Sequence, residues 1–208
     1  RSFCDLLYIH PSDVKEVAQI PFLPIQFFKT HQVLSTNQSV QETFTSSGTT
    51  GAQVSKHLVS DVSWYEASYT KAFEHFYGPI EDYTVLGLLP NYLEREGSSL
   101  IYMVNDFIHK SNNPKSGFYL DNLSELTKTL IALDQKGEKV LLIGVTFALL
   151  DLIESQTFSL KNTVIMETGG MKGRRKELIR EELHEFLESL SLVCPSIFSW
   201  SQVKAPLS

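Results

Sequence analysis

Six consecutive residues near the start of the chain are all Ser, Thr or Gly, and they are Ser46, Ser47, Gly48, Thr49, Thr50 and Gly51. They follow residues 41–45, a run with the composition of a β-strand. Glycines reach the positive φ values that turn successive N–H groups toward one point, and the hydroxyls add further donors. Backbone and side-chain donors of this kind suit phosphate oxygens. The segment therefore has the donors that a loop around the phosphates of a nucleotide would need.

The order of residues separates this loop from two better-known nucleotide motifs. A Walker loop ends in Gly-Lys followed by Ser or Thr, whereas Ala52 and Gln53 follow Gly51, and the first cation is Lys56. The segment does not match a dinucleotide fingerprint either. Composition alone also fits an ordinary turn or flexible loop, which is the commoner meaning of a Ser, Thr and Gly cluster.

A second glycine pair, Gly169 and Gly170, follows an expected strand over residues 163–167. Open α/β sheets place their ligands at this carboxyl edge, although a tight turn into a helix would also need glycine. Cations come next, at the amino-terminal end of a helix expected over residues 172–190, and they are Lys172, Arg174 and Arg175. They oppose the helix macrodipole, so either an anionic ligand or a solvated face balanced by downstream glutamates explains them.

Apolar periodicity predicts the elements that position these residues. Helices are expected over residues 62–76, 98–108, 123–133, 146–154 and 172–190, and strands over 27–34, 41–45, 83–89, 118–120, 139–145 and 163–167. The first strand is expected at a sheet edge, after an irregular stretch over residues 20–25 that contains two prolines. Apolar strands that alternate with helices predict an α/β fold, with a largely parallel sheet and helices on both faces.

The length and the net charge of the chain limit the domain organisation and the binding partners that we expect. The 208 residues, 42% of them hydrophobic, are enough for one α/β domain over residues 36–208 with an amino-terminal extension over residues 1–35. The net charge of -6 disfavours nucleic acid as a partner, because phosphate neutralisation needs surplus Lys and Arg. No stretch is apolar enough to span a bilayer and no leader peptide is visible, so a cytoplasmic protein is expected.

The order Ser-Ser-Gly-Thr-Thr-Gly over residues 46–51 resembles the phosphate loop of the adenylate-forming superfamily, which includes acyl-CoA synthetases, adenylation domains and insect luciferases. Within it, the chain is most similar to the acyl-protein synthetase (LuxE) family and to phenylacetate-CoA ligases. Residues 20–31, 89–100 and 166–175 are also similar to segments of these families. The resemblance implies the amino-terminal part of the large domain of such a ligase.

The resemblance also implies a reaction and its residues. Such a ligase uses ATP and magnesium to join a fatty acid or other small carboxylate to AMP, then passes the acyl group to a protein thiol or to coenzyme A. Residues 46–51 would hold the phosphates, and Gly169 and Gly170 would lie against adenine. Tyr92 and Arg95 would border the acyl pocket, or would belong to a surface loop in which Glu94 contacts Arg95.

Several motifs of the superfamily do not occur in this sequence. They are an aromatic-Gly-x-Thr-Glu motif whose Glu holds magnesium, a later Asp that binds ribose, and a carboxy-terminal domain with a catalytic Lys, or with an acyl-carrying Cys in the acyl-protein synthetases. No magnesium ligand is therefore identifiable. We expect a truncated or degenerate ligase that does not turn over alone. The alternatives are a non-catalytic nucleotide-binding or interaction module and an aryl-CoA or acyl-CoA ligase.

Overall fold

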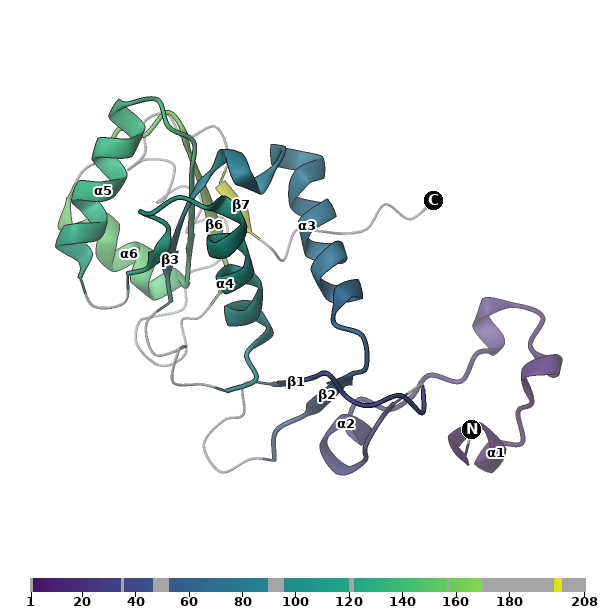
Figure 1. Cartoon of the computed structure of the whole chain (residues 1–208). Helices are drawn as coiled ribbons and strands as arrows, with labels where there is room; N and C mark the ends of the chain where they lie inside the picture. The colour runs from purple at the N-terminus through teal and green to yellow at the C-terminus, as the bar shows by residue number, and fades with distance from the viewer. Residues whose placement is uncertain are drawn as a thin grey trace. The chain divides into compact units, whose positions relative to one another are not determined.

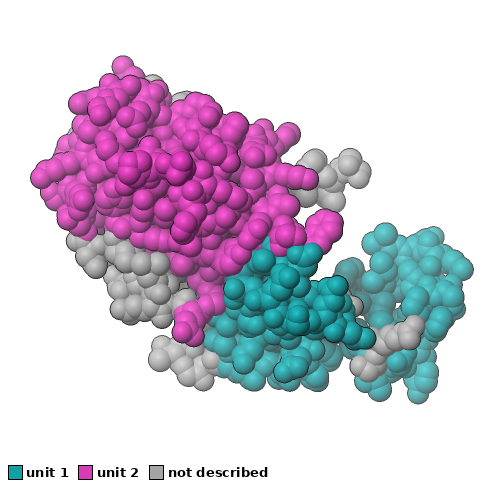
Figure 2. Space-filling view, viewed as in Figure 1, with its two compact units in different colours: residues 1–62 teal, residues 63–208 magenta. Residues whose placement is uncertain are grey.

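The computed structural model describes residues 2–34, 36–46, 53–89, 96–119, 122–156 and 158–169, together with the backbone of 197–199. Contacts divide the chain into two compact units, residues 1–62 and 63–208, which Figure 2 colours separately. The boundary predicted between residues 35 and 36 stays a prediction. The helix predicted over residues 172–190 lies outside the described residues.

The first unit contains short helices and one β-hairpin. Its elements are α1 (Ser2–Leu6), two 3₁₀ turns (Pro11–Asp13 and Val17–Gln19), α2 (Phe27–Thr30), β1 (Glu42–Thr45) and β2 (Lys56–Val59). The strands pair antiparallel, with Glu42 opposite Val59 and Thr45 opposite Lys56. Strand β1 confirms the β-like run, whereas β2 was not predicted.

The edge strand predicted over residues 27–34 is wrong, because the chain turns into helix α2 there. The amide of Phe27 donates to the Pro24 carbonyl (2.9 Å) and the amide of Phe28 to the Ile25 carbonyl (3.2 Å). Pro24 lies before the N-cap Gln26, where its missing N–H breaks no helical hydrogen bond. The stretch before α2, residues 21–24, is irregular as predicted.

The second unit is an α/β domain built on a parallel sheet. The five strands lie in the order β4-β3-β5-β6-β7, and every neighbouring pair is parallel. The strands are β3 (Thr84–Leu88), β4 (Gly117–Phe118), β5 (Val140–Gly144), β6 (Thr163–Glu167) and β7 (Ile197–Ser199). The predicted α/β class and the parallel sheet are confirmed, and β7 is an addition.

Helices cover both faces of this sheet. They are α3 (Ser63–Tyr77), α4 (Ser99–Ser111), α5 (Leu123–Gln135) and α6 (Thr146–Ser155), and Figure 1 shows α3 and α4 on one side of the sheet with α5 and α6 on the other. Two glycines explain how closely they pack. A Cβ on Gly87 would lie 3.2 Å from Val104 of α4, whereas a Cβ on Gly144 would lie 2.8 Å from Leu149 of α6. Gly144 pairs with Leu88, and Gly87 is the residue before Leu88 on β3. Because side chains alternate along a strand, the Cβ positions of Gly87 and Gly144 face opposite sides of the sheet.

Local signals set the ends of these helices. The Ser98 hydroxyl accepts from the Ile101 amide (3.3 Å) at the start of α4, and the Asn122 side chain accepts from the Glu125 amide (3.0 Å) at the start of α5. Gly78 and Gly137, with φ of 83° and 75°, follow the ends of α3 and α5.

Strands β3 and β5 are buried along their whole length, so the sheet forms the centre of the core.

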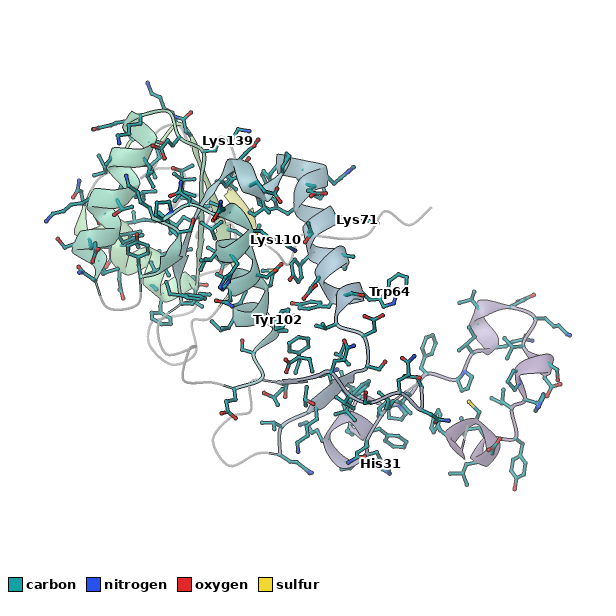
Figure 3. The ribbon with its side chains drawn as sticks, viewed as in Figure 1. His31, Trp64, Lys71, Tyr102, Lys110 and Lys139 are labelled. Carbon is teal, nitrogen blue, oxygen red and sulfur yellow. The ribbon has the colours of Figure 1, made fainter. Side chains whose placement is uncertain are left out.

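Polar side chains join α3 to α4 above this core. The Tyr69 hydroxyl donates to Asp106 (2.6 Å), and Asp106 also forms an ion pair with Lys110 (2.6 Å). The Tyr102 hydroxyl donates to Glu66 (2.5 Å), and Figure 3 labels Tyr102 and Lys110 along α4. These contacts link the two helices. They also give the buried Tyr69 hydroxyl a hydrogen-bond partner.

Candidate functional site

The predicted phosphate loop is the connection between the two strands of the hairpin. Of its residues the structure describes Ser46, while Ser47, Gly48, Thr49, Thr50 and Gly51 lie outside the described residues. Residues 53–55 lead from the loop into β2. The loop therefore begins and ends on two neighbouring antiparallel strands.

Two hydrogen bonds between Ser46 and Ser55 hold the ends of this loop together. The Ser46 amide donates to the Ser55 carbonyl (3.0 Å), and the Ser55 amide donates to the Ser46 hydroxyl (3.0 Å). In a continuing ladder the Ser46 carbonyl would take this second bond. The hydroxyl takes the place of the carbonyl, so the strand pairing ends here and the loop begins. Ser55 is only 7% exposed, which makes its amide dependent on this partner.

A pocket of about 440 Å³ lies beside the hairpin. Its wall is α2, and the Phe28 ring of this helix stacks on His57 of β2 with centroids 4.6 Å apart and planes at 23°. Among the described residues that line the pocket there are two lysines, Lys29 and Lys56, and no Asp or Glu. The pocket is therefore positive, and Gln53 and Val54 from the end of the loop also line it.

A separate candidate site, in the second unit, lies at the carboxyl edge of the sheet, where β5 and β6 end. Glu167, the last residue of β6, is 6% exposed, and its Oε1 accepts from the Thr146 hydroxyl of α6 and from the Gly169 amide (2.5 Å). The chain order reverses between β3 and β5, because β4 lies on one side of β3 and the later strands lie on the other. Doubly wound sheets bind ligands at this edge, near such a reversal.

Gly169 has the conformation of a tight turn. Its φ is 78°, a value that favours glycine, and its carbonyl accepts from the Thr146 amide (3.2 Å). The neighbouring Thr168 amide donates to the Gly144 carbonyl (3.1 Å). An added Cβ at Gly169 would meet no described atom within 4 Å. The turn explains why glycine stands here.

The other predicted site residues fall in parts of the chain that are not described. They are Gly170, Tyr92, Arg95, Lys172, Arg174 and Arg175. Ser46 belongs to the first unit and Gly169 to the second, so each is described within its own unit. Sequence reasoning missed Glu167 and the lysine pocket. For Glu167 there was a signal, because an acidic residue at the end of an apolar strand, two residues before a glycine pair, is unusual.

Within the described ranges, no group of three or more His, Cys, Asp or Glu side chains is arranged to hold a metal ion. Magnesium is therefore assigned no ligand among these residues. None of the helices in the same part of the chain is long and apolar enough to cross a membrane.

Comparisons of the chain with protein-family models, with curated proteins and with solved structures give no significant match. Each unit therefore has its own candidate site, described by its own geometry. The first unit has a hairpin loop beside a pocket with two lysines, and the second has a glycine turn braced by the buried Glu167 carboxylate.

Proposed function

We propose that this chain is the nucleotide-binding part of an ATP-dependent acyl-activating ligase. The observation that carries the proposal is the loop over residues 46–51, whose sequence suits phosphate and whose ends are clamped by the Ser46–Ser55 hydrogen bonds. A clamped loop loses less conformational entropy when it binds a ligand than a free one does. Its amides and hydroxyls supply donors on several sides of an anion.

In the proposed reaction a carboxylate oxygen attacks the α-phosphorus of ATP, a new bond forms between that oxygen and phosphorus, and the bond to the leaving pyrophosphate breaks. The products are an acyl-adenylate and pyrophosphate, and a thiol of a protein or of coenzyme A then takes the acyl group. This chemistry needs no nucleophile from the protein in the first step. Positioned donors act by orienting the phosphates and stabilising the charge that develops on them.

The glycine turn at the sheet edge supports an assignment for the base. Gly169 presents backbone without a side chain at the edge where doubly wound sheets bind ligands. Glu167 and Thr146 hold that backbone through hydrogen bonds to the Gly169 amide and carbonyl. We assign the adenine ring to this turn, with a fatty acid or other small carboxylate as the second substrate.

Calorimetry with ATP and magnesium tests the proposal. We expect wild type to bind, and a Gly48→Ala, Gly51→Ala double variant to bind at least about tenfold more weakly, because methyl groups restrict the φ values that the loop needs. Gly117→Ala is the matched control, since a Cβ there meets no described atom within 4 Å. Absence of binding by wild type would refute the proposal.

Pyrophosphate release then separates a ligase from a binding module. The protein is incubated with ATP, magnesium, a fatty acid and hydroxylamine, and hydroxamate and pyrophosphate are measured. Carboxylate-dependent release identifies a working ligase. Loop-dependent ATP binding without release identifies a nucleotide-binding module derived from one.

A further inference from the structure

We draw no further inference here: the strongest candidate, the exposed apolar side chains of the first unit (Leu6, Tyr8, Val17, Phe22 and Ile25), carries none, because nothing in the described part of the structure shows what covers them.

Discussion

Ser46 and Ser55 are joined by two hydrogen bonds at the point where β1 and β2 stop pairing, one between backbone groups and one through the Ser46 hydroxyl. The first residue of the predicted phosphate loop therefore has two roles. Its hydroxyl closes the base of the loop, so it is a support for the loop as well as a candidate donor to phosphate.

Replacing Ser46 with alanine leaves the buried Ser55 amide without this acceptor. We expect the free energy of unfolding to fall by about 1–3 kcal/mol and ATP affinity to fall with it, because an unpaired buried donor costs more than an average hydrogen bond. Urea unfolding and calorimetry measure the two effects. Ser46→Thr keeps the hydroxyl and should lie close to wild type, and an unchanged Ser46→Ala protein would contradict the closing role.

Glu167 is the second support, since its carboxylate braces the turn at Gly169. Glu167→Ala removes the acceptor of the Gly169 amide and of the Thr146 hydroxyl, so we expect a loss of about 2–4 kcal/mol in unfolding free energy. Glu167→Gln keeps one oxygen and should lose less. Urea unfolding measures both variants, and an equal loss in the two would show that the hydrogen bonds are not the cause.

Gly144 allows α6 to pack closely on the sheet. An alanine Cβ there would lie 2.8 Å from two atoms of Leu149 and 3.3 Å from the Leu88 carbonyl oxygen. We expect Gly144→Ala to destabilise the protein by about 1–3 kcal/mol, as overpacked cores do. Gly117→Ala, which meets no described atom within 4 Å, is the control for urea unfolding. Equal stability of the two variants would contradict the close packing of α6.

Tyr69 links stability to alkaline pH. Burial raises the pKa of Tyr69 above its ordinary value of 10.0, and the hydrogen bond and charge of Asp106 raise it further. Above pH 10 the unfolded chain gives up this proton while the folded chain keeps it, so stability is fully present below pH 10 and falls as the pH rises above it. Burial also raises the pKa of Tyr65 and of Tyr83, which adds to the fall.

Tyr69→Phe should make that alkaline decline shallower, although the lost hydrogen bond lowers stability by about 1 kcal/mol near neutral pH. The free energy of unfolding in urea, measured between pH 8 and pH 11, tests this slope. Tyr8→Phe is the control, because the Tyr8 ring is 95% exposed. A slope for Tyr69→Phe equal to that of wild type would contradict the linkage.

Most of the second unit was predictable because its signals are local. The strand expected over residues 163–167 has the bounds of β6, and Ser98 caps α4 as expected. In the first unit, local signals were weaker. Short aromatic runs such as Phe27 and Phe28 fit a strand or a helix equally well, and only the hydrogen bonds after Pro24 decide for α2. Half of the residues of β2 are polar, and the strand is stabilised by its pairing with β1.

The candidate site divides in the same way. A cluster of Ser, Thr and Gly is visible in sequence, but its composition also fits an ordinary turn, so the prediction of a phosphate loop over residues 46–51 depends on the resemblance of their order to the superfamily's loop. The pocket that Lys29 and Lys56 line joins residues of α2 to residues of β2, a contact that no sequence pattern indicates. The bracing of Gly169 likewise depends on Thr146, a hydrogen-bond partner of Glu167 that is 21 residues away in the chain.

Amide hydrogen exchange of the segment from Thr45 to Lys56 is the measurement that tests the central claim most directly, because the claim is that backbone N–H groups of this loop bind phosphate. ATP with magnesium should slow exchange in residues 46–51, AMP should slow it far less, and the Gly48→Ala, Gly51→Ala variant should lose the effect. Exchange in this segment that is the same with and without ATP, at concentrations where calorimetry shows binding, would contradict the assignment of the loop.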